Sequence, residues 1–357
     1  MSDTKIVSTK KNTILPAPAM TDVFDMLCIK AGESGRDRSL FGGCLTRAGE
    51  LFRPFIAGIS FPHIFLECPL SGDPYLDLTV LYGRLTEGTV VKSKYCEGCD
   101  ELFRRYIRMK QDHPEVVFGF ELDTSKEDPG MAAVHFDPRG KNFLVTPFCE
   151  AIGEDRYGEL YLQTAEKLAD TLPPSFFGMF RGREEAPLRV CGYLGKKEMN
   201  QITGGRDLLL SAFEAAGFSA YDDRMMDEIV NVFKIAPCET DYQLDIYPDG
   251  KAGDVFSIDL RLAERAAASV RESFASGAAS EIMSYFTELG IADERTGMLS
   301  GMATSFAFPS LDETGEAAQY AMVLHPMWLK IRWKGARLCS AKCYSLMRAG
   351  FIRSTLP

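Results

Sequence analysis

Two kinds of hydrophobic spacing alternate along the chain. Apolar residues recur at every third or fourth position, the period of an amphipathic helix, in segments 21–28, 40–52, 99–109, 157–168, 207–216, 225–233 and 266–289. Pairs of strand-like runs lie between these segments, and residues typical of turns, such as Pro248-Asp249-Gly250, join the two runs of a pair. The alternation predicts β-hairpins separated by helices.

Five such pairs can be recognised: 55–59 with 63–69, 116–122 with 131–136, 176–180 with 188–194, 242–247 with 255–260, and 327–333 with 336–344. A sheet of ten antiparallel strands has two bare edges, and closing it into a barrel removes them. Helices would then cover the outside with their apolar stripes. The predicted fold class is α+β: a ten-stranded antiparallel β-barrel of five αββα repeats, surrounded by helices. An open α+β sheet in two domains is the alternative.

The inside of this barrel is predicted to be polar. Successive side chains of a strand point to opposite faces, and polar residues gather on one face of several strands. Such sets are His63, Phe65 and Glu67; Arg189, Cys191 and Tyr193; Gln243, Asp245 and Tyr247. Ile64, Leu66 and Cys68 would face the helices, and Trp328, Lys330 and Arg332 lie opposite the apolar Leu329, Ile331 and Trp333. A barrel wider than eight strands leaves room for a central tunnel.

Composition narrows the class of protein. The 357 residues carry a net charge of −10, which disfavours nucleic acid and anionic membranes as partners. The polar N-terminus has no apolar core of a signal peptide, and no stretch approaches the roughly 20 apolar residues that span a bilayer. We therefore expect a cytoplasmic protein with reduced thiols, in which residues 1–15 are disordered and residues 16–350 form a single barrel domain.

The sequence predicts no metal site. Cys96 and Cys99 form one close pair, but a structural zinc site usually needs a second, and the spacing of Cys339 and Cys343 does not provide it. The Gly204-Gly205-Arg206-Asp207 run lacks the lysine and the spacing of a phosphate-binding loop, so we interpret it as a loop that ends in a helix-capping aspartate.

The order of local motifs resembles that of the ABBA (PT-barrel) aromatic prenyltransferases over roughly residues 20–345. The resemblance rests on the sequence of 66–75, which ends Ser71-Gly72-Asp73-Pro74-Tyr75, and on 130–136, 190–194 and 246–251, taken in this order. It implies a barrel that binds an aromatic small molecule and an allylic diphosphate and joins them by electrophilic aromatic substitution. No cofactor is required, and magnesium, which some members use, stays open.

The resemblance also implies roles for particular residues of the tunnel. The candidates are Arg189 with Lys342 or Arg337 for the diphosphate; Tyr193, Tyr247 and Tyr344 for shielding the allylic cation; and Glu67 or His63 for accepting the ring proton. A salt bridge with Glu184, Glu185 or Asp245 is the alternative role of Arg189. No oligomeric state is predicted.

The chain departs from the family pattern at several basic positions. The lysine expected in the second repeat falls on Ala132 or Ala133, and the arginine expected after the fourth hairpin falls on or beside Asp254. The lysine of the last repeat falls near Cys339 or Ser340, and the acidic magnesium ligand of some members falls near His63. Two alternatives follow: a cyclase or isomerase that uses no prenyl diphosphate, with Glu67, Asp245, Asp254 and His63 as acids and bases, and a non-catalytic protein that binds a hydrophobic ligand.

Overall fold

The computed structural model describes residues 15–16, 18–57, 63–82, 91–124, 126–181, 186–236, 239–262, 267–312 and 314–352. The strands are β1 (Leu15–Pro16), β2 (His63–Pro69), β3 (Asp77–Tyr82), β4 (Val117–Leu122), β5 (Ala133–Asp137), β6 (Phe176–Met179), β7 (Leu188–Leu194), β8 (Thr240–Ile246), β9 (Ala252–Arg261), β10 (Thr304–Leu311), β11 (Ala317–Lys334) and β12 (Arg337–Ile352). The α-helices are α1 (Met20–Gly32), α2 (Arg36–Phe41), α3 (Leu45–Ile56), α4 (Asp100–Asp112), α5 (Val145–Glu150), α6 (Asp155–Lys167), α7 (Lys196–Gly204), α8 (Asp207–Ala216), α9 (Asp223–Ile235), α10 (Ala267–Ser276), α11 (Ala278–Glu288) and α12 (Thr296–Leu299).

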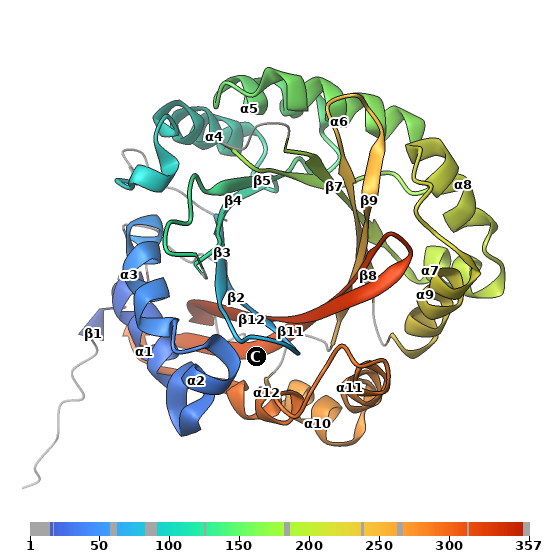
Figure 1. Cartoon of the computed structure of the whole chain (residues 1–357). Coiled ribbons are helices and arrows are strands. Elements are labelled where there is room, and N and C mark those ends of the chain that lie inside the picture. The colour runs from blue at the N-terminus through green and yellow to red at the C-terminus, as the bar shows by residue number, and fades with distance from the viewer. Residues whose placement is uncertain are drawn as a thin grey trace, which may run out of the picture.

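The strands form a closed barrel (Figure 1). Within the described residues the sheet has the order β1-β10-β11-β12-β2-β3-β4-β5-β6-β7-β8-β9, and an additional pairing of β9 with β11 joins ten of the strands into a ring. Every pairing inside the ring is antiparallel. The helices surround the barrel on the outside. The predicted ten-stranded antiparallel barrel is therefore confirmed, and the open-sheet alternative is wrong.

Strand alternation divides an apolar outer face from a polar inner face. Ile64, Leu66 and Cys68 of β2 are completely or almost completely buried beneath the helices, as expected. Leu329, Ile331 and Trp333 of β11 are fully buried in the same way. The indole Nε1 of Trp333 donates a hydrogen bond of 2.9 Å to Glu228 of α9, so the helix layer also satisfies the one polar atom of this side chain.

Several predicted elements need correction; the helix expected at 40–52, for example, is interrupted between the end of α2 at Phe41 and the start of α3 at Leu45. Residues 55–56 belong to the end of α3 and not to a strand, because Phe52, Phe55 and Ile56 have the helical spacing of one buried face. The partner of β2 in the first hairpin is β3 instead, while 58–62 lie outside the described residues. The long helix expected at 266–289 is two helices, α10 and α11, separated at Gly277.

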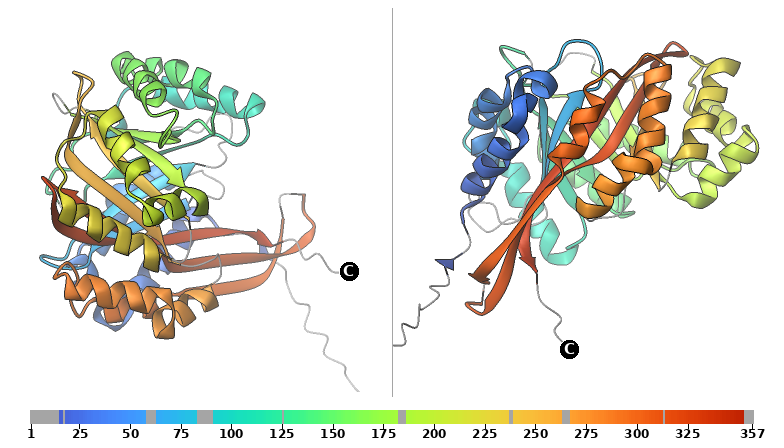
Figure 2. Two further views of the ribbon diagram at one scale, coloured as in Figure 1. Left: turned by 90° about the vertical axis from the view of Figure 1, so that its right-hand side faces the viewer. Right: turned by 90° about the horizontal axis from the view of Figure 1, so that it is seen from below.

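The last hairpin is much longer than predicted and extends past the ring (Figure 2). The first half of β11 pairs with β10 from residue 317 to 324, and its second half pairs with β9 from residue 328 to 334. A register shift between Pro326 and Trp328 separates the two halves. One face of the extension packs on α1, where the buried Tyr320 hydroxyl lies 3.9 Å from the sulfur of Met20.

Candidate active site in the barrel lumen

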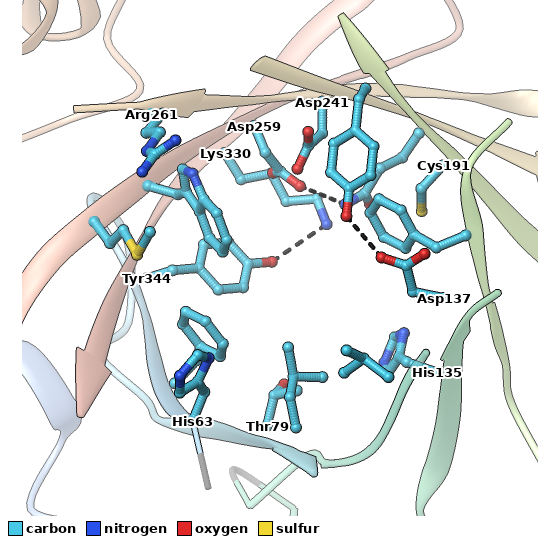
Figure 3. Close-up of a pocket in the computed structure, with 18 of the residues that line it drawn as sticks. His63, Thr79, His135, Asp137, Cys191, Asp241, Asp259, Arg261, Lys330 and Tyr344 are labelled. Carbon is cyan, nitrogen blue, oxygen red and sulfur yellow. Dashed lines mark hydrogen bonds between the residues drawn. The ribbon is translucent and has the colours of Figure 1, made fainter. Parts of the chain in front are cut away.

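The barrel encloses a cavity of about 810 Å³, which we call the lumen. Its lining comes from strands all around the ring, and it includes five lysine or arginine and five aspartate or glutamate side chains. Figure 3 shows Asp241, Asp259 and Lys330 on one side of the lumen and His63, Thr79 and His135 on the other. The lining is thus highly charged but nearly balanced in sign, and the arrangement of individual charges decides what it can bind.

Three aromatic side chains of the lining, Phe65 of β2, Trp328 of β11 and Tyr344 of β12, form a group that we call the aromatic slot. The rings of Phe65 and Trp328 stack with centroids 5.3 Å apart and an angle of 20° between their planes. Tyr344 of β12 is the direct register partner of Trp328 and lines the same cavity. Flat aromatic surfaces of this kind bind planar rings and also stabilise cations through their π faces.

Two lumen arginines are already paired with carboxylates. Arg189 of β7 lies opposite Asp245 of β8, and its Nε is 2.9 Å from Oδ1 of Asp245. Burial opposes the charge of Arg189, but the Asp245 carboxylate outweighs it and raises the pKa of the guanidinium. Arg139 pairs with Asp137 at 3.0 Å. Neither arginine is a free anion receptor in this structure. Arg189 forms the salt bridge with Asp245 that the sequence offered as its alternative role.

Tyr193 is held at the edge of the lumen by Asp137, the carboxylate that is paired with Arg139. Its hydroxyl donates a hydrogen bond of 2.9 Å to Oδ2 of Asp137, and its ring packs against Phe176 at 5.4 Å. The side chain is nonetheless 47% exposed, because its open face borders the lumen. It is thus fixed in position and accessible to a ligand.

Glu121 and His135 form a further ionisable pair that the sequence did not indicate. His135 Nε2 lies 2.8 Å from Oε2 of Glu121. Burial would raise the pKa of Glu121, but the hydrogen bond and charge of His135, together with Arg189 and Lys330, lower it. The His135 ring lies directly over Gly178, where an added Cβ would be 2.8 Å from two ring atoms. Only glycine leaves room for the imidazole at this position.

Lys330 and Arg261 are two lumen cations that no carboxylate approaches to ion-pair distance in the described part of the chain. Lys330 Nζ donates to the hydroxyl of Tyr344 at 3.3 Å, and the Nε of Arg261 is buried without a hydrogen-bond partner. Among the described residues neither side chain forms an ion pair within 4.0 Å. They lie on the adjacent strands β11 and β9, where Trp328 is the register partner of Arg261 and Lys330 that of Asp259. We call these two residues, which lie on adjacent strands and flank the register position of Trp328, the cationic corner.

A group of oxygen acceptors lies next to this corner. Asp241 of β8 and Asp259 of β9 are direct register partners, and Gln243 Nε2 donates a bond of 2.5 Å to Oδ2 of Asp259. Oδ1 of Asp259 and Oε1 of Gln243 are buried without a hydrogen-bond partner. Burial raises the pKa of both aspartates, and for Asp241 the charge of Asp259 adds to this effect.

A second polar network lies behind Tyr344, in the wall of the lumen. Lys342 Nζ lies 2.8 Å from Oε1 of Glu67 and 3.4 Å from Oδ2 of Asp77, and it sits 5.0 Å from the ring centre of Tyr75. Two carboxyl groups share one lysine here, and burial together with the charge of Glu67 raises the pKa of Asp77 to about 8. Glu67, the predicted proton acceptor, thus lies in this network behind Tyr344 and outside the lining of the cavity.

The structure therefore divides the predicted site residues into three groups. His63, Arg189, Tyr193 and Tyr344 line the lumen, whereas Glu67, Lys342 and Asp245 are buried in ion pairs within its wall. Tyr247, Asp254 and Arg337 lie at hairpin ends away from the cavity lining. The roles assigned to all of them stay predictions. Lys330, Arg261, Asp241, Asp259, Glu121 and His135 were missed as site residues.

His63 is placed to accept a proton. It lies at the beginning of β2, exposed toward the lumen, and its register partners are Leu81 and Arg348. Partial burial and the charge of Arg348 lower the pKa of the imidazole. The ring is therefore mostly neutral near pH 7.

In the part of the chain that the structure describes, no cluster of three or more histidine, cysteine, aspartate or glutamate side chains could hold a metal ion. Cys99 instead accepts a hydrogen bond of 2.9 Å from Arg181. Of the helices described, none is both long and apolar enough to cross a lipid bilayer.

No protein-family model matches the sequence, and no curated protein matches it either. Among solved structures, the chain is similar to that of NotF prenyltransferase, with 12% identity over 95% of this chain and 97% of that one and a TM-score of 0.46. A second NotF structure, in complex with brevianamide F and DMSPP, is 11% identical over 95% of this chain and 96% of that one, with a TM-score of 0.49. The prenyltransferase PriB, in a ternary complex with L-tryptophan and dimethylallyl thiolodiphosphate, is 14% identical over 95% of this chain and 99% of that one, with a TM-score of 0.40.

Proposed function

We propose that the protein is an enzyme that binds an aromatic small molecule in the lumen and transfers an allylic group from a diphosphate to it. The observation that supports this proposal is the cationic corner of Lys330 and Arg261 beside the aromatic slot. A diphosphate is the kind of ligand that unpaired cations in a partly desolvated site attract most strongly. The cavity volume of about 810 Å³ lies in the range of small-molecule sites.

The reaction can be assigned to particular side chains. The carbon–oxygen bond of the donor breaks, and the electron pair leaves with the diphosphate, whose growing charge Lys330 and Arg261 stabilise without reorganisation. The faces of Trp328 and Tyr344 shield the allylic cation. An aromatic carbon of the acceptor then forms the new carbon–carbon bond, and the proton released from that carbon passes to the neutral imidazole of His63.

A second candidate is acid–base catalysis without a prenyl donor, in a cyclase or isomerase. It is favoured by the equal numbers of basic and acidic side chains in the lining and by the raised pKa values of Asp241 and Asp259, since perturbed carboxyl groups in a cavity are typical of acid–base catalysis. A carrier for purely hydrophobic ligands fits less well, because so charged a lining is costly to desolvate.

Calorimetric titration with dimethylallyl and geranyl thiolodiphosphate, with and without magnesium, tests the proposal. We expect micromolar binding, weakened by about tenfold or more in Lys330→Met. Lys334→Met is the matched control, because Lys334 is an exposed lysine on the same strand but at the hairpin end. If neither donor binds at millimolar concentration in either condition, prenyl transfer is rejected in favour of acid–base chemistry.

A further inference from the structure

The wall between β8 and β9 contains more hydrogen-bond acceptors than donors. Oδ1 of Asp259 and Oε1 of Gln243 have no partner, although their side chains are only 8% and 9% exposed. The single donor among them, Nε2 of Gln243, is used by the other oxygen of Asp259. Buried acceptors are normally satisfied, so two orphans side by side at a cavity wall indicate a missing donor.

The missing donor would carry positive charge. Asp241 is the register partner of Asp259, and strand alternation places both carboxyl groups on the inner face, together with Gln243. Two carboxyl groups this close cannot both ionise easily unless a cation lies between them. A ligand with several donors and a positive charge would satisfy the unpaired oxygens and relieve the repulsion.

The cations of the lumen do not fill this position. Lys330 extends toward the hydroxyl of Tyr344, and Arg189 and Arg139 are paired with Asp245 and Asp137. Arg261 forms no ion pair among the described residues. Lys330 and Arg189 act on Asp259, and Arg261 acts on Asp241, from beyond ion-pair distance, and each lowers the pKa of that aspartate. Burial and the acidic Glu67, Asp137 and Glu239 act in the opposite direction, and the pKa of both aspartates stays raised, so a positive charge in direct contact would still stabilise the pair.

We infer that Asp241, Gln243 and Asp259 form a binding site for an ammonium group, and that the molecule held in the lumen is an aromatic amine. An ammonium group has three donors and no acceptor, which matches three converging groups that can each accept. A divalent metal ion fits less well, because magnesium and calcium take six or more oxygen ligands. The site lies beside the aromatic slot, since Asp259 is the strand-register partner of Lys330, which follows Trp328 by two residues.

This inference rests on the proposed function only in placing an aromatic molecule in the lumen. It has a consequence that a passive cavity would not show: burial and the charge of Asp259 raise the pKa of Asp241, and a bound ammonium group would lower it again, so any proton that the carboxyl pair holds is displaced on binding. The O–H bond of one carboxylic acid breaks and the proton passes to the buffer, while the ammonium group keeps its own protons. Amine binding should therefore release protons, in an amount that calorimetry in two buffers of different ionisation enthalpy measures.

Three indole probes that differ only at the end of the side chain test the site: tryptamine, 3-ethylindole and indole-3-propionate. At pH 7 we expect tryptamine to bind about tenfold or more tighter than 3-ethylindole, to release protons, and to bind tighter than indole-3-propionate. Asp259→Asn, which preserves the shape of the side chain, should bring tryptamine to within about twofold of 3-ethylindole. Asp170→Asn, at an exposed aspartate far from the lumen lining, is the control.

The inference is overturned if 3-ethylindole or indole-3-propionate binds as tightly as tryptamine, if none of the three binds, or if magnesium chloride competes with tryptamine. Should Asp259→Asn fail to fold, the ratio of tryptamine to 3-ethylindole in the unaltered protein and its proton release still decide. None of the probes contains a diphosphate. A failure of the allylic donors to bind would thus reject prenyl transfer without affecting this result. Equally, a failure of tryptamine to bind would reject the ammonium site without deciding whether the donors bind.

Discussion

Arg189 and Asp245 face each other across β7 and β8 and form an ion pair in which both side chains are largely buried, with 2.9 Å between Nε and Oδ1. Removing one partner leaves the other charge uncompensated, which costs about 3–5 kcal/mol for a buried pair. Arg189→Met should therefore lower the free energy of unfolding by this amount, as measured by urea denaturation followed by circular dichroism.

The double variant Arg189→Met/Asp245→Leu separates this structural role from the predicted contact with the diphosphate. It should recover most of the lost stability, because no unpaired charge remains. If Arg189→Met is as stable as the unaltered protein but no longer binds allylic thiolodiphosphates, Arg189 contacts the ligand as the family resemblance implies.

The carboxyl pair beside Lys342 makes stability depend on pH. Folding raises the pKa of Asp77 from 3.8 to about 8, so the folded state holds this proton more tightly than the unfolded state. Stability from this group is complete below the unfolded pKa and falls as the pH rises toward 8. Asp77→Asn cannot ionise. We expect it to be more stable than the unaltered protein at pH 8 by about 1–3 kcal/mol, with a smaller difference at pH 5.

Chemical denaturation at pH 5, 6, 7 and 8 gives this comparison directly. A constant difference in the free energy of unfolding between the two proteins across the series would contradict this prediction. It would show that Asp77 is ionised in the folded state at every pH tested and that Lys342 balances its charge.

The two tryptophans should report ligand binding differently. Trp328 lines the lumen, where a planar ligand would contact it, whereas Trp333 is fully buried on the outer face of β11. A non-fluorescent aromatic ligand should therefore change the emission of Trp328 and leave that of Trp333 unaltered. Trp328→Phe should remove the response while keeping most of the stacking on Phe65. A response that persists in Trp328→Phe would place the ligand elsewhere.

Gly178 of β6 controls the position of His135. In Gly178→Ala the new Cβ would lie 2.8 Å from the imidazole, so the ring must move and its bond with Glu121 breaks. We expect a loss of about 1–3 kcal/mol in the free energy of unfolding, as is usual when a packed site receives an extra methyl group. Gly204→Ala, at the end of α7 where an added Cβ meets nothing, is the control. Equal stability of the two variants in thermal unfolding would contradict the packing argument.

Much of the architecture could be predicted from the alternation of two hydrophobic periods. Hairpins two to four fall close to the observed strands, the fifth lies in the right place but is much longer than predicted, and the separation of Trp328 and Lys330 from Leu329 and Trp333 is correct. The first hairpin failed because Phe55 and Ile56 are apolar in a short run that suits a strand as well as the last turn of a helix. The domain boundaries and the cytoplasmic location stay predictions.

The charge arrangement of the site could not be predicted in the same way. Whether Arg189 is free or paired depends on the register of β7 against β8, and the neighbours of Lys330 depend on where β11 closes the ring against β9. No local pattern encodes a pairing between strands so distant in sequence. Alternation placed Lys330 on the polar face of its strand, and this was the one signal in the sequence that could have identified it as a site residue.

The way in which β11 changes partners also sets the order of folding. Within the described residues, its second half pairs with the edge of β9 that β8 leaves open, and β12 pairs residues 342–348 with residues 63–69 of β2 at the other edge. Until these two strands are in place, β2 and β9 are open sheet edges, and such edges pair readily with other chains. Closure therefore requires contacts between the most distant parts of the barrel, which makes folding slow and leaves nascent or truncated chains prone to aggregation.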